Sequence, residues 1–538
     1  MNQLKLSYRQ ILDILSQNNL LVEHNIKNTD GCVEFISHDS RNITQNTLFF
    51  CKGAGFKEEY LYDAIKKGAV CYVKERNELC RDELCSSADI AQNSRTNAVR
   101  PYNIIVNDIR RSIAIIAPMY YNYPYKNLNL IGVTGTKGKT TVAYFLHNIL
   151  NNYAKSRTGL STSIEKYTGK RSEEAHLNTP EPCDLQRYFH EAAESGIKYF
   201  TMEVSSQAYK TGRVDGIKFD NGIFLNISED HIGPLEHEDF EDYLNCKLEL
   251  MKNSSNIVIN RETDCFKRVL EAARFVGDGA LDVPPVNKQI TLFGSEKIKN
   301  ECDYYYTDVK KDRNLTHFNV KSDRNNYSET FTIKTPGLFN VENALAAITL
   351  CKTPALNIDD GSIRAGLFET TVPGRMNILD NGDITVIIDY AHNLLSFSKL
   401  YESIALDYAG RKIISVGGSP GGKAFKRRRD FAETVGKSSD YIYLTAEDPQ
   451  YEDAAKICEE MTGYIPDTPR EIIIDRAEAV RTAIMRASPG DVVVLLGKGT
   501  EEYQKINGKW EFYASDYTIA LQALSEKEPE KYRKAVNK

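Results

Sequence analysis

Hydrophobic and polar positions follow two periods along the middle of the chain. Between about residues 126 and 372, short apolar runs of strand length alternate with segments whose apolar residues recur at helical spacing. Such runs indicate buried strands, and their alternation with helices favours a mostly parallel sheet covered by helices. The predicted strands are 128–133 (LNLIGV), 199–204 (YFTMEV), 222–227 (GIFLNI) and 256–260 (NIVIN).

The C-terminal part of the chain repeats this alternation. One helix is well marked there by apolar residues at the spacing of a single helical face. These residues are Phe397, Leu400, Tyr401, Ile404 and Tyr408. We therefore predict an α/β fold whose last domain is doubly wound and Rossmann-like, with sites at the carboxyl ends of its strands. Its predicted strands are 384–390 (ITVIIDY), 412–418 (KIISVGG), 441–446 (YIYLTA), 471–475 (EIIID) and 491–497 (DVVVLLG).

Two breaks in the pattern divide the chain into three predicted domains. Residues 120–127 (YYNYPYKN) carry the proline and asparagine typical of a linker, and residues 370–376 (TTVPGRM) mark a second boundary. We predict an N-terminal domain over 1–124, a central domain over 125–372 and a C-terminal domain over 373–538. A chain of 538 residues is too long for one hydrophobic core, which agrees with this division.

Composition and charge narrow the class of protein. Hydrophobic residues make up 41% and charged residues 26% of the chain, a balance typical of soluble globular proteins. The net charge of -6 provides no global attraction to nucleic acid, so no nucleic-acid partner is expected. The basic run 423–429 (KAFKRRR) is interpreted as a solvated loop. No apolar stretch approaches the roughly 20 residues that cross a bilayer, so we expect a cytoplasmic protein with no membrane insertion.

The eleven cysteines are scattered along the chain. None belongs to a CxxC pair, and Cys80 and Cys85 are the closest two. This spacing favours buried or incidental thiols over a disulfide framework or a zinc site.

A glycine-rich loop separates one predicted strand from a predicted helix. Residues 132–145 are GVTGTKGKTTVAYF, and apolar residues at helical spacing continue from Val142. Gly135 and Gly138 allow backbone N–H groups to turn inward at the helix N-terminus, where a phosphate can bind. Lys139 and Thr140 stand where a P-loop places its phosphate-binding lysine and its Mg²⁺-binding hydroxyl.

This loop is shorter than the general P-loop pattern GxxxxGK[ST], because residue 133 is valine and the glycine lies one place earlier. A glycine turn that merely precedes a helix is the alternative interpretation. The strand, loop and helix together favour an ATP-type ligand. A phosphate loop alone does not distinguish a motor, a kinase, a GTPase and a ligase.

Further motifs resemble those of the Mur ligases, specifically the type that adds the third residue of the peptidoglycan stem peptide. The resemblance is closest over residues 201–251, which include EVSSQAY, GRV, EDHIG and FEDYLNCKLELM. It extends in order across all three predicted domains, to HDSR (38–41), NTPE (178–181), GLFNVENALAA (337–347), VPGRM (372–376), IDYAHN (388–393), EDPQYED (447–453) and GKGTEEYQ (497–504).

The resemblance implies a first domain that holds the UDP end of a substrate, a central P-loop ATPase domain and a third domain that brings an amino acid. In the family's reaction ATP transfers its γ-phosphoryl group to a substrate carboxylate, and an amine attacks the acyl phosphate to form an amide. Several anionic oxygens meet in such a step, so cations are required. The implied substrates are UDP-N-acetylmuramoyl-L-alanyl-D-glutamate and a diamino acid, with ATP and Mg²⁺, and a monomer is expected.

Matching the family's motifs residue by residue assigns the nucleotide and metal sites. The ATP-binding residues implied in this way are Gly135, Thr136, Lys137, Gly138, Lys139, Thr140, Thr141, Asn343, Arg375, Asp389 and His392. The implied metal ligands are Thr140, Glu203, His231 and Lys247, and the implied catalytic residues are Lys139, Lys247 and His231. The alternatives are a solvated strand-end carboxylate at Glu203, a capping or core histidine at His231 and a helix cap at Asn343.

Lys247 corresponds to a lysine that Mur ligases carry as a carbamate, which helps to hold a second Mg²⁺. An unmodified ammonium group about 4 Å from a cation would cost roughly 4 kcal/mol per unit charge at an effective dielectric constant of about 20. The carbamate reverses the sign of this interaction. An ordinary surface lysine on a helix is the alternative interpretation.

The family's contacts to the UDP-linked substrate match Ser40, Arg41, Asn178, Thr179, Ser205 and Arg213. Ser40 and Arg41 would hold the nucleotide end of this substrate. The planar guanidinium group of an arginine binds two oxygens at once, which suits Arg213 to a carboxylate or phosphate, although a salt-bridged helix arginine is the alternative. Gln207 and Thr211 depart from the family's pattern, which leaves the contacts of that turn open.

The amino-acid site is implied at Asp448, Gln450, Gly497 and Glu501. Ligases of this type that add meso-diaminopimelate carry the motif DNPR, whose arginine binds the second carboxylate of that substrate. Residue 450 is glutamine here, and residues 445–453 (TAEDPQYED) resemble the lysine-adding form. Acidic residues at 448, 452 and 501 would accept an ammonium group, so L-lysine is predicted. Basic residues 423–428 could supply the missing cation, and meso-diaminopimelate is therefore the alternative.

Two other functions compete with this hypothesis. A folylpolyglutamate synthetase-like ligase shares the central ATPase and the third domain, but it has no DSR segment in a long first domain and no EVSSQAY motif. A catalytically silent nucleotide-binding regulator usually loses phosphate or metal ligands, whereas the implied ligands are all present in this chain.

Overall fold

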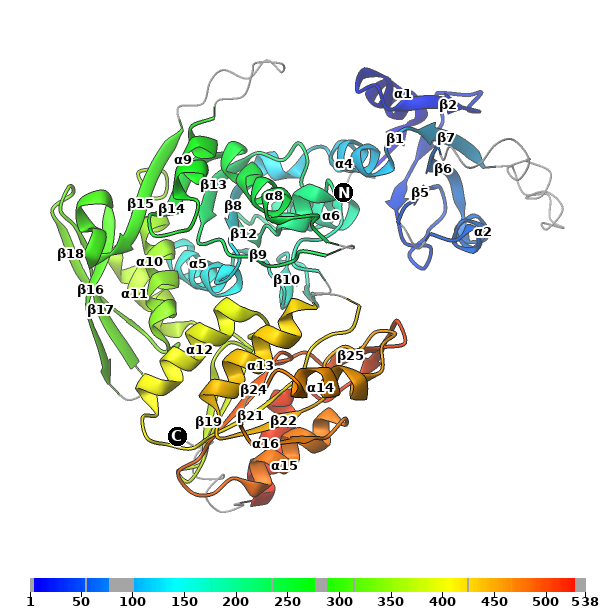
Figure 1. Ribbon diagram of the computed structural model, residues 1–538. Coiled ribbons are helices and arrows are strands. Elements are labelled where there is room, and N and C mark those ends of the chain that lie inside the picture. Colours follow the sequence, from blue (N-terminus) through cyan, green and yellow to red (C-terminus); the bar gives the residue numbers. More distant parts are fainter. Residues whose placement is uncertain are drawn as a thin grey trace. The chain divides into compact units, whose positions relative to one another are not determined.

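The protein is described by a computed structural model (Figure 1) that falls into two compact units. The first unit contains residues 1–132, 157–221 and 253–255, and the second contains 133–156, 222–252 and 256–538. Strands β8 (Asn129–Thr134), β13 (Phe219–Phe224) and β14 (Ser254–Asn260) pass through the division and contribute to both units. The residues described are 4–53, 56–76, 101–175, 177–233, 236–275, 288–312, 315–422, 425–465 and 467–527.

The N-terminal sheet belongs to the first unit and has a hydrophobic core on each face. Alternate residues of its interior strand β5 point to opposite sides, because successive side chains of a strand alternate. Leu48 and Phe50 join a core with helices α1 and α4, whereas Phe49 and Cys51 join a second core with α2. The strand order is β2 (Leu21–His24), β7 (Tyr102–Val106), β6 (Ala69–Glu75), β5 (Thr47–Cys51) and β4 (Phe35–Ser37). The helices are α1 (Tyr8–Gln17), α2 (Glu58–Lys67) and α4 (Ile109–Tyr120), and β1 (Leu6–Ser7) pairs with β3 (Cys32–Val33).

The central sheet contains every strand that the apolar runs predict between residues 126 and 372. Strand pairs β9–β12, β14–β15 and β15–β16 are parallel, which confirms the mostly parallel α/β class, whereas β16, β17 and β18 are antiparallel. The order is β11 (Ser172–Glu174), β10 (Glu165–Tyr167), β9 (Gly159–Ser161), β12 (Tyr199–Glu203), β8, β13, β14, β15 (Gln289–Ser295), β16 (Tyr304–Asp312), β17 (Leu315–Ser322) and β18 (Tyr327–Ile333).

The helix after the glycine-rich loop, α5 (Lys139–Ala154), is buried along most of its length. Gly366 in α11 lies directly against its backbone, since a Cβ atom at Gly366 would come within 2.4 Å of the Ile149 backbone. This close approach fixes the position of α5 and of the loop before it. The other helical segments of this region are η1 (Pro124–Asn127), α6 (Pro182–Glu194), α7 (Ser206–Lys210), α8 (Phe240–Lys252), α9 (Phe266–Arg274), η2 (Glu296–Glu301), α10 (Leu338–Lys352) and α11 (Asp360–Glu369).

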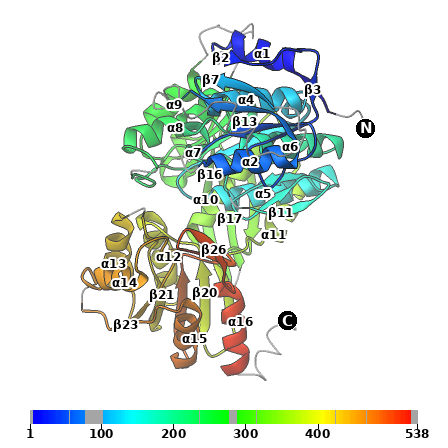
Figure 2. The same ribbon diagram turned by 90° about the vertical axis from the view of Figure 1, so that its right-hand side faces the viewer.

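The C-terminal sheet is doubly wound, as predicted. Helices α12, α13 and α14 share a hydrophobic core with one face of the sheet, and α15 and α16 share a core with the other face (Figure 2). The strands are parallel except for β19, and the order is β19 (Asn377–Asp380), β20 (Thr385–Asp389), β24 (Val492–Leu496), β21 (Ile413–Gly417), β22 (Tyr441–Leu444) and β23 (Arg470–Ile472). The remaining elements are α12 (Leu394–Asp407), α13 (Lys426–Ser438), α14 (Ala454–Thr462), α15 (Arg476–Arg486), α16 (Asp516–Lys527) and the hairpin of β25 (Tyr503–Ile506) and β26 (Lys509–Phe512).

The domain boundaries near residues 125 and 373 stay predictions. The searched part of the chain, which is the set of described residues, contains no helix of the length and apolar character needed to cross a membrane. Cys80 and Cys85 lie outside the described residues, as does Lys423 of the basic run.

Candidate functional site

The glycine-rich loop connects β8 directly to α5 in the second unit. Gly135 has φ +153° and Gly138 has φ +88°, and the space around both glycines is closed. A Cβ atom at Gly138 would lie 2.3 Å from Oδ1 of Asn343, and one at Gly135 would lie 2.9 Å from Cβ of Leu225. Glycine is therefore required at both positions, because the conformation and the packing each exclude a side chain.

Two lysine side chains converge on one carbonyl group of this loop. Lys139 Nζ donates hydrogen bonds to the carbonyl oxygens of Gly135 at 2.8 Å and Thr136 at 3.0 Å. Lys247, from the middle of α8, donates to the same Gly135 oxygen at 2.8 Å and is 2% exposed. Burial, reinforced by the nearby Lys139 and Lys137 ammonium groups, places the pKa of Lys247 well below its ordinary value. These surroundings shift the protonation balance of Lys247 toward the neutral amine.

A third lysine of the loop, Lys137, is held by groups on two other segments. Its Nζ lies 3.0 Å from Nε2 of His392 and 3.6 Å from Oδ2 of Asp230, and its backbone N–H donates to Oδ1 of Asn226 at 2.8 Å. Burial lowers the pKa of Lys137 to about 7, although the Asp230 carboxylate acts in the opposite direction. Asp230 is a member of this site that the sequence analysis missed.

The tautomer of His392 follows from its hydrogen bonds. Its Nδ1 lies 2.7 Å from the carbonyl oxygen of Tyr390, which can only accept, so Nδ1 carries the proton. Burial and the neighbouring Lys137 hold the pKa of His392 well below its usual value. In the neutral ring Nε2 then accepts a hydrogen bond from Lys137.

His231 lies in a loop that is attached to the N-terminal end of α8. It has φ +57°, its Nδ1 lies 2.8 Å from Oε1 of Glu236, and its side chain is 41% exposed. The carbonyl oxygen of His231 accepts from the backbone N–H of His237 at 3.0 Å. His237 is buried, and the ring turns toward α8, the helix that also carries Lys247.

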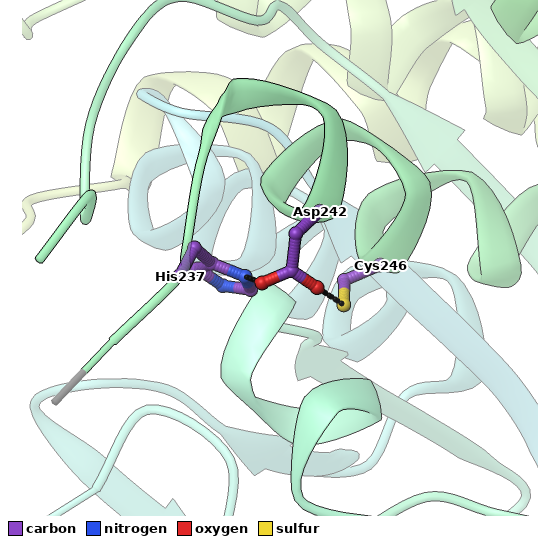
Figure 3. A group of neighbouring side chains, drawn as sticks. All are labelled: His237, Asp242 and Cys246. Carbon is purple, nitrogen blue, oxygen red and sulfur yellow. Dashed lines mark hydrogen bonds and ion pairs between the residues drawn. The ribbon is translucent and has the colours of Figure 1, made fainter. Parts of the chain in front are cut away.

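Figure 3 shows how the His237 ring is held. The carboxylate of Asp242 lies between His237 Nδ1, at 2.9 Å, and Cys246 Sγ, at 3.7 Å. Each of these residues has one nitrogen, oxygen or sulfur atom that could bind a metal ion, and the three atoms lie within 4.8 Å of one another. Since the imidazole–carboxylate contact joins the His231 loop to the first turn of α8, we interpret the group as the anchor of that loop. The sequence analysis did not identify it.

Three of the implied ATP-binding residues, Asn343, Arg375 and Asp389, also lie in the second unit. Asn343 is buried in α10 and donates to Oδ1 of Asn340 at 3.0 Å. Both oxygens of the Asp389 carboxylate accept backbone N–H groups, from Met376 at 2.8 Å and Ala391 at 2.7 Å, and burial raises its pKa. The guanidinium group of Arg375 lies 4.4 Å from the centroid of the Tyr390 ring.

In the first unit, Glu203 and Thr179 form one hydrogen-bonded group. Glu203 is 1% exposed, at the end of β12, and its Oε1 accepts the backbone N–H of Ser163 at 2.8 Å. Thr179 Oγ1 donates to the Glu203 carbonyl oxygen at 3.0 Å and accepts the backbone N–H of Ser205 at 3.1 Å. Ser205 in turn caps α7. Burial and these contacts exclude a solvated strand-end carboxylate at Glu203.

Arg213 is salt-bridged, as the alternative interpretation anticipated, but it lies beyond the end of α7. Its Nε is 3.1 Å from Oε1 of Glu181, and its Nη1 donates to the carbonyl oxygen of Thr179 at 3.2 Å. Arg41 is different, because its side chain is 87% exposed and pairs only with the adjacent Asp39 among the described ion pairs. Asn178 is also exposed.

At the amino-acid end, a lysine occupies the space between two implied site acids. Lys498 Nζ lies 2.6 Å from Oε2 of Glu501 and 3.1 Å from Oδ1 of Asp448, and the Lys498 side chain is 1% exposed. Burial alone would lower the pKa of Lys498, but the two carboxylates raise it. Gly497 has φ +100°, and a Cβ atom there would lie 2.5 Å from Oε2 of Glu447. The sequence analysis missed Lys498, although it lies within the GKGTEEYQ motif.

Glu452 and the basic run also differ from expectation. Arg428 is 4% exposed and its Nη2 lies 2.7 Å from Oε2 of Glu452, so the interpretation of the whole run as a solvated loop is wrong. Residues 426–429 of the run form the first turn of α13, where Arg427 and Arg428 pair with acids of neighbouring segments. Gln450 has φ +58°, and its backbone N–H donates to the Lys505 carbonyl oxygen at 2.9 Å.

Comparison with known proteins agrees with this architecture. The Mur ligase middle domain matches residues 133–351, and the domain described as Mur ligase, glutamate ligase domain matches 374–499. A UDP-N-acetylmuramyl-tripeptide synthetase of Lactobacillus delbrueckii subsp. bulgaricus is 36% identical, over 98% of this chain and 100% of the relative. A UDP-N-acetylmuramoyl-L-alanyl-D-glutamate–L-lysine ligase of Enterococcus faecalis is 38% identical, over 92% of each.

A solved structure of a UDP-N-acetylmuramoyl-L-alanyl-D-glutamate–2,6-diaminopimelate ligase has the same fold. Its TM-score is 0.61 at 22% identity, covering 97% of this chain and 99% of that structure. At this identity the likeness supports the fold and not the substrate. The match of both family domains, and the identity of relatives over nearly the whole chain, show that this protein belongs to the Mur ligase family.

Proposed function

We propose that this protein is an ATP-dependent ligase that adds L-lysine to UDP-N-acetylmuramoyl-L-alanyl-D-glutamate and releases ADP and phosphate. The observation that carries the proposal is 38% identity over 92% of the chain to a relative named as the L-lysine ligase. We expect the protein to act as a monomer in the cytoplasm, where it participates in peptidoglycan biosynthesis.

In the first chemical step, a carboxylate oxygen of the UDP-linked substrate attacks the γ-phosphorus of ATP, and the bond to the β-phosphate oxygen breaks. The implied ATP-binding residues hold the nucleotide, with Lys139 balancing the charge of the transferred group. The Lys139 ammonium group now rests on two loop carbonyl oxygens, so it needs only a side-chain rotation to reach a phosphate. Neutralising the three equatorial oxygens is the main catalytic requirement of phosphoryl transfer.

We assign the metal ligands to Thr140, Glu203, His231 and the carbamate of Lys247. Mg²⁺ supplies positive charge to the phosphate oxygens when it is bound. The neutral amine is the form of a lysine that reacts with CO₂, and the lowered pKa of Lys247 increases the share of that form. In this reaction the C–N bond forms and one proton leaves the nitrogen. The resulting carbamate carries a negative charge, which the cationic surroundings of Lys139 and Lys137 stabilise.

For the UDP-linked substrate, we assign contacts to Ser40, Arg41, Asn178, Thr179, Ser205 and Arg213. The exposed Arg41 guanidinium group is free of any contact other than Asp39 among the described ion pairs, which leaves donors for a diphosphate. Protein contacts around Thr179 instead fix Ser205 and Arg213, and we assign Thr179 and Ser205 to the sugar-peptide end and Arg213 to a carboxylate or phosphate of the substrate.

The incoming amine attacks the carbonyl carbon of the acyl phosphate, the C–O bond to phosphate breaks, and the amine loses a proton. The choice of L-lysine depends on residue 450, because glutamine lacks the charge that pairs with a second carboxylate. A hydrogen bond to a charged group contributes about 1.5–3 kcal/mol, so the absence of arginine removes roughly tenfold to a hundredfold of affinity for diaminopimelate.

A panel of amino acids tests the substrate. Phosphate release is measured with ATP, UDP-N-acetylmuramoyl-L-alanyl-D-glutamate and either L-lysine, meso-diaminopimelate or L-ornithine. We expect release to require the UDP-linked substrate and to be fastest with L-lysine. Preference for diaminopimelate would refute the amino-acid assignment, whereas ATP binding without turnover would favour a silent regulator. Turnover with a folate and glutamate would favour the folylpolyglutamate synthetase-like alternative.

A further inference from the structure

Lys166 is a buried lysine in β10 that no part of the proposed reaction uses. It pairs in register with Ser161 of β9 on one side and Glu173 of β11 on the other. Its side chain is 3% exposed, which is unusual because lysine normally extends its ammonium group to water. A lysine is retained at such a position only where its three N–H donors find partners.

The partners of Lys166 are backbone carbonyl oxygens from two separate segments. Its Nζ donates to Leu177 at 2.7 Å and to Asn178 at 3.3 Å, and also to Thr162. Thr162 directly follows β9, whereas Leu177 and Asn178 lie after β11. The ammonium group therefore joins the end of one strand to the segment 177–179.

Both segments lead to residues of the proposed substrate site in the same unit. Ser163, next to Thr162, donates its backbone N–H to the Glu203 carboxylate at 2.8 Å. Thr179, next to Asn178, donates to the Glu203 carbonyl oxygen at 3.0 Å. Its own carbonyl oxygen accepts from Arg213 at 3.2 Å. Two of the carbonyl groups that Lys166 binds therefore belong to residues that directly precede Ser163 and Thr179, and these two residues contact Glu203.

The burial of Lys166 has an electrostatic consequence. Burial lowers the pKa of Lys166 to about 7, and the Glu203 carboxylate acts against this shift. Lys170, on the same hairpin, is a useful contrast. It is more than a third exposed, and it pairs with the surface residue Glu194 at 2.5 Å.

We propose that Lys166 is a positioning residue that holds the segment 177–179 in the conformation that binds the UDP-linked substrate. This inference rests on the function proposed above. Without the three hydrogen bonds of Lys166, the substrate itself has to order the segment. The free-energy cost of that ordering then weakens the binding of the substrate. The effect therefore falls on the KM of one substrate and not on those of ATP or L-lysine.

The experiment compares Lys166→Met, Lys166→Gln and the control Lys170→Met in the full-length protein. We expect Lys166→Met to raise the KM for UDP-N-acetylmuramoyl-L-alanyl-D-glutamate about 10- to 100-fold, with kcat, the KM for ATP and the KM for L-lysine changed less than about threefold. Lys166→Gln retains two N–H donors and should restore part of the loss. Lys170→Met should match the unaltered protein.

Three results would overturn the inference. One is an unchanged KM for the UDP-linked substrate in Lys166→Met. The others are a uniform loss of kcat and failure of both Lys166 variants to fold by circular dichroism, since either would assign Lys166 to general stability. The unaltered protein separates this test from the proposed function, because its lack of UDP-substrate-dependent turnover would refute the function itself.

Discussion

Lys247 and Lys498 are both buried lysines of the second unit, but the structure shifts their pKa values in opposite directions. Lys247 donates to a backbone carbonyl group and has the ammonium groups of Lys139 and Lys137 nearby, so its charged form is disfavoured. Lys498 lies between the carboxylates of Asp448 and Glu501, so its charged form is favoured. Burial is nearly the same for both residues.

The comparison separates two kinds of charged region. The region around the phosphate loop brings together Lys137, Lys139 and Lys247, and the pKa values of Lys137 and Lys247 are lowered, so a bound anion would favour their charged forms. The region around Lys498 is already balanced by its own ion pairs. Adding an anion stabilises the first region, whereas removing a partner destabilises the second.

The largest effect is expected from replacing Lys247, in the region around the phosphate loop. Lys247→Met should lower the rate of ligation by about 10³-fold or more, because neither the carbamate nor the amine remains. Phosphate release at saturating substrates measures this. The matched control is Lys252→Met, on the same helix but paired at the surface with Glu249. Unchanged activity in Lys247→Met would remove the residue from the mechanism.

A smaller effect on activity is expected from adding a side chain at Gly138 of the glycine-rich loop. In Gly138→Ala the new Cβ atom would meet Asn343 Oδ1, and the backbone at φ +88° disfavours any L side chain. We expect the KM for ATP to rise about 10- to 100-fold, since the loop amides must shift. Gly216→Ala provides the control, because that glycine also has a positive φ but a Cβ atom there would meet no other atom within 4 Å. Equal KM values in both variants would contradict the assignment.

Changing the amino-acid end should alter specificity more than rate. Gln450→Arg introduces the charge that a second carboxylate requires, so the ratio of kcat/KM for L-lysine to that for meso-diaminopimelate should fall about tenfold. Competition between the two amino acids in one reaction measures the ratio. If the ratio stays constant, residue 450 does not contact the side chain of the substrate.

In the region around Lys498, we expect a substitution to lower the stability of the protein rather than its rate of ligation. Lys498→Met leaves two carboxylates without their shared ammonium group, and we expect about 2–3 kcal/mol of destabilisation, seen as a drop of about 5–10 °C in a thermal melt. Because the pKa of Lys498 is raised above 10.5, its contribution is present below that pH and is lost only at more alkaline pH. The melting difference should therefore be flat between about pH 6 and pH 9. Lys509→Met, on exposed β26, is the control.

The smallest expected effect is the uptake of a proton when ATP binds. Lys137 has a pKa near 7, so above that pH it is mostly neutral. ATP phosphates would favour the ammonium form and raise this pKa, which requires the protein to take up about one proton per nucleotide at about pH 8. Calorimetric titrations in buffers of different ionisation enthalpy measure the uptake. It should disappear in Lys137→Met, and equal uptake in that variant would assign the proton to another group.

Most strands of the C-terminal sheet and four of the central sheet could be predicted because they are buried on both faces, whereas the parallel strands β9 and β15 were not predicted. Continuous apolar runs such as residues 492–496 in β24 then indicate a strand without further context. Strands β16, β17 and β18 were not predicted. Polar residues interrupt them, since they alternate between buried and accessible positions, as in Leu315–Ser322. Their pairing partners lie on neighbouring strands, which the local pattern does not identify.

The site shows the same distinction. The order of glycines, lysines and threonines in residues 135–141 was sufficient to predict a phosphate loop before α5, because the required backbone conformation is local. The motifs were sufficient to identify the family, which the comparisons confirm. The roles of the individual residues stay predictions. The basic run shows why, since Arg428 is buried through partners on other segments that its own sequence does not reveal.

By itself, then, the sequence determined the fold class, the glycine-rich turn between a strand and a helix, and the family, because backbone conformation and apolar periodicity depend on neighbours along the chain. Only the tertiary structure decided which charges are balanced. The same amino acid, lysine, occurs in four different electrostatic environments, at residues 137, 166, 247 and 498. Their partners lie from three to 255 residues away along the chain, and Coulomb interactions depend on separation in space and on burial.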